Sequence, residues 1–71
     1  MENSAKKCLA MIEKKKSLYG IKDEAIARFI GISERTYKRR KNHPEEITLG
    51  EMEILMKLLK FSKEERMEVF L

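Results

Sequence analysis

The sequence predicts an all-α fold, a compact domain of five short helices. Apolar residues recur three and four positions apart through most of the chain, and capping signatures open several of the segments. No segment shows the alternating, β-branched pattern of a strand. With 71 residues, the chain is expected to form one domain over residues 1–71, small enough to benefit from dimerisation.

The first predicted helix begins near Asn3 or Ser4, either of which can act as an N-cap, and runs to about Leu18. Its apolar stripe comprises Ala5, Cys8, Leu9 and Ile12, with Tyr19 as a candidate extension. We interpret Cys8 as a small buried apolar residue, because neither a second thiol nor a base lies near it in sequence. A single cysteine cannot form an internal disulfide, which suits a cytoplasmic protein.

Gly20 ends this helix, and a second helix is predicted over about residues 23–30, with two acidic residues in its first turn. Its inner face comprises Ile26, Ala27 and Ile30. The next residues predict a three-residue turn. Gly31 can take the left-handed conformation that closes a helix, and Ser33 can cap the helix that follows.

The third predicted helix covers about residues 33–42 and must end before Pro44. On a helical wheel one side holds Glu34, Arg35, Lys38, Arg39 and Asn42, and the other holds Thr36, Tyr37 and Arg40. Only Tyr37 offers a large packing group, so the polar side is expected to face outward and to serve as a binding surface. Two helices joined through such a turn predict a helix-turn-helix, whose second helix can enter the DNA major groove.

A loop is predicted over residues 41–46, followed by two helices that each begin with a capping box. Thr48 and Glu51 open the fourth helix, which runs to about Lys60, and Ser62 and Glu65 open the short last one. The apolar face of the fourth helix comprises Leu49, Met52, Leu55, Met56, Leu58 and Leu59. The apolar residues of the last helix are Met67, Val69, Phe70 and Leu71.

Charge is distributed unevenly along the chain. Residues 1–41 hold 12 Lys and Arg against 5 Asp and Glu, a net charge of +7, and residues 42–71 hold 4 against 7, a net charge of −3. This asymmetry indicates a polyanionic partner that meets one side of the molecule, although lysine is also a common residue on helix surfaces. There is no run of 18 apolar residues and no signal segment, so neither a membrane span nor secretion is expected.

Nothing in the sequence predicts catalysis, a metal or a cofactor. There is no Gly-rich phosphate loop and no Cys/His cluster. The two capping boxes explain Glu51 and Glu65, and the remaining glutamates suit a solvated helix surface. His43 is the only histidine, and it has no second histidine, Cys or Asp at ligand spacing.

The order Ala27, Gly31, Ile32 and Ser33 is small-x-x-x-Gly-apolar-Ser, and it is followed by Pro44 and by the run TLGEMEIL. In this order and spacing the chain resembles the phage repressor and Cro-like (Xre-type) family over roughly residues 18–61. The resemblance implies a lambda-repressor-like fold with the helix-turn-helix at its second and third helices.

The chain also departs from the family pattern. Lys22 stands where the family usually has a Thr or Ser cap, and Asp23 stands where it often has a Gln. Arg40 replaces an inward aromatic or aliphatic group, and it can pair with an acid such as Glu51 or Glu24 or reach a phosphate. Lys41 is basic where an acidic residue is common.

The resemblance assigns base contacts to the positions that the wheel had selected, Glu34, Arg35, Lys38 and Arg39. Arginine can pair with guanine O6 and N7, and glutamate can accept from cytosine N4, although a glutamate in the first turn also suits the helix dipole. The candidate phosphate contacts are Arg40, Lys41, Asn42, His43 and Thr48. The candidate dimer interface is Met67, Val69, Phe70 and Leu71, which can equally close the core.

We therefore expect a cytoplasmic regulator of transcription that binds a specific double-stranded DNA sequence, as a homodimer on a near-palindromic operator. The second hypothesis is a protein-interaction module of the antitoxin or antirepressor type that uses the apolar C-terminal helix. The third is a nonspecific nucleic-acid binder, which would show the salt dependence of binding without a sequence preference.

Overall fold

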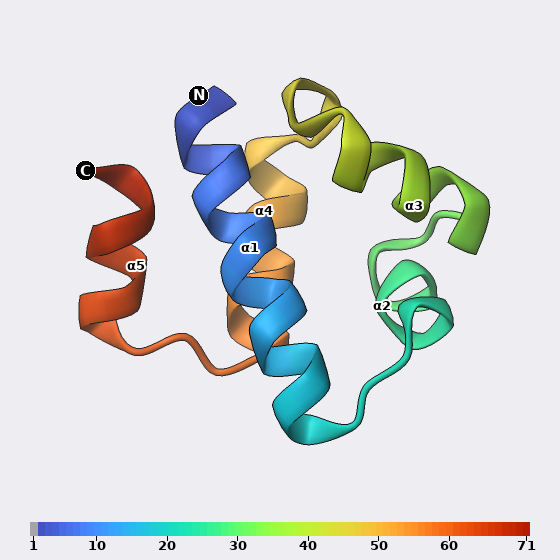
Figure 1. Cartoon of the computed structure of the whole chain (residues 1–71), viewed down its shortest axis with the longest axis horizontal. Helices are drawn as coiled ribbons and strands as arrows, with labels where there is room; N and C mark the ends of the chain where they lie inside the picture. Colours follow the sequence, from blue (N-terminus) through green and yellow to red (C-terminus); the bar gives the residue numbers. More distant parts are fainter. Residues whose placement is uncertain (1) are drawn as a thin grey trace.

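A computed structural model describes residues 2–71, with side chains from Asn3 onward, and shows five α-helices and one short 3₁₀ helix (Figure 1). These are α1 (Glu2–Tyr19), α2 (Asp23–Ile30), α3 (Glu34–Asn42), η1 (Pro44–Glu46), α4 (Leu49–Leu58) and α5 (Lys63–Phe70). No strand occurs among the described residues, so the all-α prediction is confirmed. None of their helices is long and apolar enough to cross a membrane.

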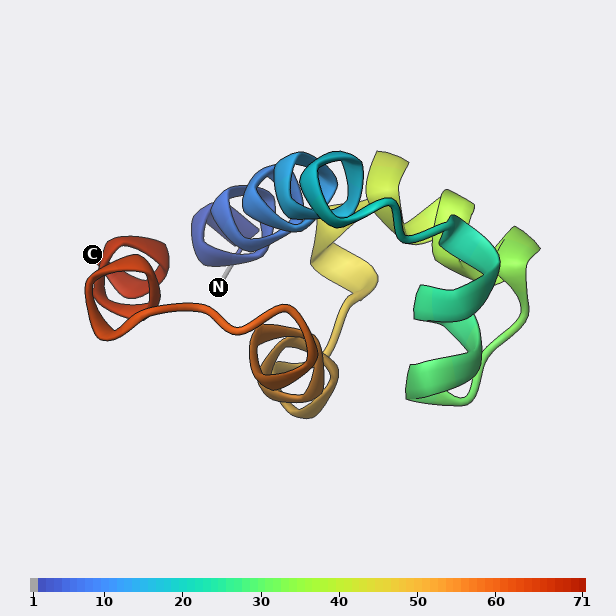
Figure 2. The same ribbon diagram turned by 90° about the horizontal axis from the view of Figure 1, so that it is seen from below.

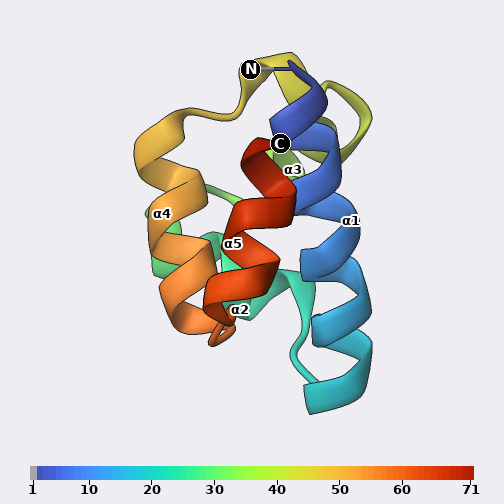
Figure 3. The ribbon, with the colours of Figure 1, turned by 90° about the vertical axis from the view of Figure 1, so that its left-hand side faces the viewer.

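The helices form a flattened body of 29 × 25 × 17 Å. In Figure 2, α1 and α3 lie toward one side and α4 toward the other, while α2 and α5 stand at opposite ends. Figure 3 shows α5 in front of α1 and α4, and α5 packs against α1. The surface of α3 and the surface of α5 therefore face different parts of the surroundings.

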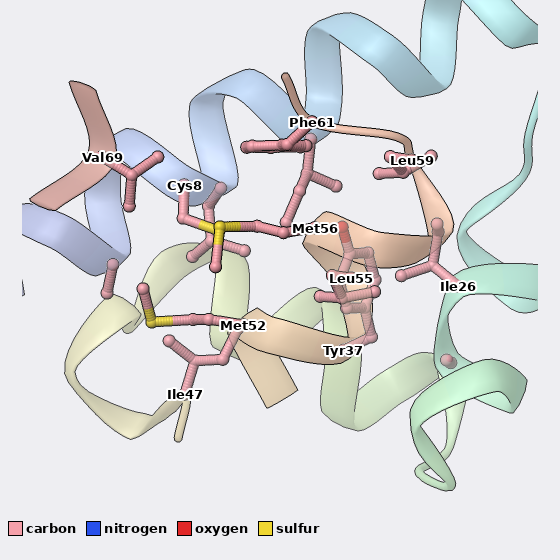
Figure 4. Close-up of a cluster of buried hydrophobic side chains, with 14 residues drawn as sticks. Cys8, Ile26, Tyr37, Ile47, Met52, Leu55, Met56, Leu59, Phe61 and Val69 are labelled. Carbon is pink, nitrogen blue, oxygen red and sulfur yellow. The ribbon is translucent and has the colours of Figure 1, made fainter. Parts of the chain in front are cut away.

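All five α-helices contribute to one buried core. Figure 4 shows the side chains of α4 near its centre, with Val69 of α5 and Ile26 of α2 approaching from opposite sides. The buried residues are Ala5, Cys8, Leu9, Ile12, Ile26, Ala27, Tyr37, Ile47, Met52, Leu55, Met56, Leu59, Phe61 and Val69. The apolar stripes predicted for the helices thus meet, except that Tyr19 and Leu49 are about half exposed.

The predicted caps of the later helices are confirmed. The Ser33 hydroxyl accepts a hydrogen bond from the Thr36 amide at 3.1 Å, and both capping boxes have their two reciprocal bonds. α4 ends at Leu58, two residues earlier than predicted. Just beyond it, Lys60 has φ +55°, which is not a helical conformation.

Two predictions about helix boundaries are wrong. Asn3 and Ser4 lie inside α1, since the helix already includes Glu2, and they therefore do not cap it. Residues 41–46 are not a simple loop, because Lys41 and Asn42 complete α3 and Pro44 begins η1. Proline suits that first position, since it has no amide hydrogen to leave unpaired.

Candidate nucleic-acid interface

The connection between α2 and α3 is a tight three-residue turn. Gly31 has φ +79°, a left-handed conformation that is costly for residues with a Cβ. The Gly31 amide donates to the Arg28 carbonyl at 3.2 Å, and the Ile32 amide donates to the Ala27 carbonyl at 3.0 Å. This pair of bonds is a Schellman ending, and the Ser33 cap starts α3 directly after it.

The turn leaves α3 with one buried side and one exposed side. Tyr37 is fully buried against the core, and Thr36 and Arg40 are partly buried beside it. The exposed side chains are Glu34, Arg35, Lys38, Arg39 and Asn42, which are the five that the helical wheel placed together. An exposed face with three long cationic side chains on a helix anchored by one aromatic ring can present hydrogen-bond donors to a polyanion.

Local acids engage two of the three cations on this face. Lys38 Nζ lies 3.0 Å from Glu34 one turn earlier, and Arg39 Nη2 lies 3.1 Å from Glu46 of η1. Both pairs are exposed, so each is a weak interaction that a stronger anion can replace. Within the described residues, Arg35 has no acidic side chain at ion-pair distance, and its guanidinium is available to a ligand.

The five residues suggested for phosphate contact divide into two groups. Asn42 and His43 are exposed just beyond the basic face, with His43 Nδ1 3.4 Å from Glu45. The Thr48 hydroxyl accepts from the Glu51 amide at 3.1 Å, so its own role is to cap α4. The free amides of that helix start remain close to the surface, because Thr48, Leu49 and Gly50 are exposed.

Arg40 and Lys41 do not fit the suggested phosphate role, because internal acids already pair with them. Arg40 turns inward and forms an ion pair with Glu51, one of the partners considered from the sequence. Lys41 Nζ lies 2.9 Å from Asp23 and 3.3 Å from Glu13. Since both cations are mostly covered, a phosphate would have to replace partners that are already in place.

The structure shows a cluster of hydrogen-bonded side chains around Glu13 that the sequence did not predict. Glu13 of α1 accepts hydrogen bonds from Lys16, from the Tyr37 hydroxyl and from Lys41. Burial opposes ionisation of this carboxyl, but the bonds and charges of Lys16 and Lys41 outweigh burial and lower its pKa. Burial and the neighbouring charge of Glu13 raise the pKa of Tyr37, which keeps its hydroxyl protonated as a donor. The contacts of Glu13 with Tyr37 and Lys41 join residues 24 and 28 positions apart, so no local pattern could predict them.

The described residues contain one group that resembles a set of metal ligands. Side-chain donor atoms of His43, Glu45 and Glu46 lie within 4.8 Å of one another, all at exposed residues. Contacts with neighbouring side chains already account for the arrangement, since Glu46 pairs with Arg39 and Glu45 lies 3.4 Å from His43 Nδ1. The buried Cys8 offers no reactive thiolate near neutral pH, because burial and the charge of Glu53 raise its pKa to about 11.

The apolar C-terminal residues divide between core and surface. Val69 is fully buried and belongs to the core, so it cannot contribute to a dimer interface as suggested. Met67, Phe70 and Leu71 are exposed, with Leu71 88% accessible. Other large apolar side chains are also exposed elsewhere, among them Leu18 and Phe29.

Comparisons of the chain with models of protein families, with curated proteins and with solved structures find no match.

Proposed function

We propose that the chain is a regulator of transcription that binds a specific sequence of double-stranded DNA, of the phage repressor and Cro-like type, with α3 as its recognition helix. The observation that supports this most is the division of α3 into a buried anchor, Tyr37, and an opposite face of exposed polar and cationic side chains. A helix whose outer face presents donors and acceptors fits the width of the major groove.

The exposed face of α3 carries hydrogen-bond donors and an acceptor that match the edges of bases in the major groove. Arg35 and Arg39 can each donate two hydrogen bonds to guanine O6 and N7, and Lys38 can donate to the same atoms. Glu34 can accept from cytosine N4, once Lys38 leaves it for the DNA. Each well-formed pair of this kind discriminates against a wrong base by about 1–3 kcal/mol.

Phosphates flanking the groove can be held by the side chains and amides around the ends of α3 and η1. Asn42 and His43 are the candidates that remain from the sequence prediction, with the amides near Thr48 at the start of α4. In this proposal Arg40 and Lys41 keep their internal partners and orient α3.

A single domain of this size makes few base contacts, so we propose that it acts as a homodimer on a near-palindromic site in the cytoplasm. The exposed residues Met67, Phe70 and Leu71 are the candidate dimer surface. Met67 and Phe70 lie on α5 and Leu71 directly follows it, and α5 is at the end of the molecule opposite to α2 (Figure 2).

The same exposed apolar end supports a second candidate function, binding of a partner protein in the manner of an antitoxin or antirepressor. Three exposed apolar side chains within five residues form a surface that a partner helix could cover. Such a module is expected to bind no DNA at moderate salt.

The test is selection of binding sites from a random duplex pool at about 150 mM salt, where nonspecific binding is weak. Three chains are compared: the native chain, an Arg35→Ala/Arg39→Ala variant, and a Lys57→Ala/Lys63→Ala control. The control also removes two exposed cations, but from α4 and α5.

We expect a palindromic motif for the native chain and the control, preferred over random duplex by ~10³ or more, and no motif for the Arg35/Arg39 variant. Enrichment of no motif by the native chain would overturn the proposal and favour a protein partner. Salt-dependent binding without a motif would instead indicate a nonspecific binder.

A further inference from the structure

Four charged side chains from three helices form a closed ring in which acids and bases alternate. Going around the ring, Glu13 accepts from Lys16 at 2.8 Å, Lys16 pairs with Asp23, Asp23 accepts from Lys41 at 2.9 Å, and Lys41 returns to Glu13 at 3.3 Å. Glu13 and Lys16 belong to α1, Asp23 begins α2, and Lys41 lies in the last turn of α3. The four formal charges cancel.

The ring lies directly beside the anchor of α3. The Tyr37 hydroxyl donates to Glu13 Oε2 at 3.2 Å. The ammonium groups of Lys16 and Lys41 lie 5.8 Å and 5.4 Å from the centre of the Tyr37 ring, within the range of a cation–π contact. Since Tyr37 is fully buried, its hydroxyl needs the acceptor that Glu13 provides.

Three of the four side chains in the ring are mostly covered, and Glu13 lies at its more exposed edge. The side chains of Lys16, Asp23 and Lys41 are only 11%, 16% and 24% exposed, and that of Glu13 is 41% exposed. In such a setting the loss of one partner leaves another charge uncompensated, which costs more than the loss of a surface pair. The four groups therefore favour one arrangement of the three helices.

The ring contacts the later turns of α3, beyond the turn that starts the helix. Gly31 and Ser33 hold the start of α3 against α2. The pairs Arg39–Glu46 and Arg40–Glu51 hold its later turns to η1 and α4, while the ring is the link to α1. Glu13 reaches α3 at two positions one turn apart, Tyr37 and Lys41, and both lie beside the outward residues Lys38 and Arg39. A roll of α3 would displace those side chains relative to the bases, and recognition tolerates about 10–20° of misorientation.

We infer that the ring of Glu13, Lys16, Asp23 and Lys41 sets the roll of α3 against α1, and that Glu13 is a positioning residue for recognition of a DNA sequence. This inference rests on the proposed function. It assigns Glu13 a role in specificity although the residue lies on α1 and touches no base. A ring that only stabilised the fold would lower the melting temperature in its variants without changing which duplex is preferred.

The test compares Glu13→Gln with a matched control, Glu53→Gln. Glutamine removes the charge of residue 13 but keeps an oxygen for the Tyr37 hydroxyl. Glu53 pairs with Arg66 at 3.3 Å between α4 and α5, and it is exposed to a similar degree, 46% against 41%. The dissociation constants for the selected duplex and for a scrambled duplex are measured at equal salt, together with the melting temperature.

Residual dipolar couplings of backbone amides measure the orientation of α3 relative to α1 in the same variants. We expect Glu13→Gln to lower the ratio of selected to scrambled affinity by about tenfold, which corresponds to ~1.4 kcal/mol, and to change the orientation of α3. Glu53→Gln is expected to leave the ratio and the orientation as in the native chain.

Two further variants keep the test decisive. Tyr37→Phe removes a single hydrogen bond to Glu13, and it serves as the test if Glu13→Gln folds too poorly to assay. It is also expected to lower the ratio of selected to scrambled affinity. Glu13→Gln/Lys41→Met also removes the ammonium of Lys41, which would otherwise share Asp23 with Lys16, and so restores the balance of charge. If the ring positions α3, this double variant should recover melting temperature without recovering the affinity ratio.

The inference is overturned if Glu13→Gln and Tyr37→Phe keep the native ratio and the native orientation of α3. It is also overturned if the double variant recovers the ratio together with the melting temperature, because the ring would then only stabilise the fold. Failure of the proposed function is a separate outcome, since it appears as a native chain that prefers no duplex.

Discussion

At the scale of single residues, Tyr37 connects the core to the polar face of α3. It is the only fully buried residue of that helix, and its hydroxyl reaches α1. We expect Tyr37→Ala to cost about 3–5 kcal/mol of unfolding free energy, which is much of what a domain this small has. Denaturant unfolding followed by circular dichroism measures this. A cost below about 1 kcal/mol would show that α3 is anchored by other contacts.

Glu46 is expected to weaken DNA binding, because it holds the guanidinium of Arg39 at 3.1 Å. The Glu46→Gln variant should bind the selected duplex about two- to fivefold more tightly, since an exposed pair of this kind contributes up to ~1 kcal/mol. Glu64→Gln makes the same change in net charge at an exposed residue of α5, without freeing Arg39 or His43. Equal gains in affinity for the two variants, measured by fluorescence anisotropy, would mean that only net charge matters.

At the scale of helices, the ring around Glu13 makes the packing of α1 against α3 sensitive to acid. The pKa of Glu13 is lowered in the folded chain, so its contribution to stability is present above its ordinary value of 4.5. That contribution disappears as the pH falls through the lower folded pKa. Glu13 contacts Lys16 of α1 and Tyr37 and Lys41 of α3. Asp23 of α2 shares both lysines with it, and Lys6 of α1 lines the same pocket as Glu13.

We therefore expect the melting temperature of the native chain to fall more steeply between about pH 5 and pH 3 than that of Glu13→Gln, since Glu13 is protonated below its ordinary pKa of 4.5 as the pH falls through its lower folded pKa. Asp23 titrates in both chains, so the difference between the two curves reports Glu13. Parallel curves would show that Glu13 titrates as it does in the unfolded chain.

The helices themselves could be predicted well from local signals, because each signal acts within a few residues. The Ser33, Thr48 and Ser62 caps are confirmed, as is the division of α3 into two sides. The prediction for Asn3 and Ser4 is wrong because a polar residue near a helix start does not have to be the cap.

The partners of Arg40 and Lys41 could not be fixed from sequence for a different reason. Whether a cation near the end of α3 points to solvent or to an acid depends on which helices pack beside it. Lys41 meets Glu13 and Asp23 only because α1 and α2 pack against the end of α3. A long-range contact of this kind leaves no periodic signal in the sequence.

At the scale of the whole molecule, the candidate DNA surface and the candidate dimer surface are separate. The Met67→Glu/Phe70→Glu variant should leave binding to a single half-site unchanged, but it should abolish cooperative binding to the full palindrome, because charged residues disfavour burial in an interface. Gel-shift titrations of half-site and full-site duplexes distinguish these effects. Unchanged cooperativity would exclude this end of α5 from the dimer interface.

Contact between the exposed face of α3 and DNA can be observed in amide and arginine side-chain NMR spectra of the native chain. The labelled chain is titrated with the selected duplex, and the signals that shift are mapped onto the structure. We expect the largest shifts over residues 34–42, including the side-chain Nε–H signals of Arg35 and Arg39. Shifts confined to α5, with residues 34–42 unchanged, would contradict the proposed role of α3.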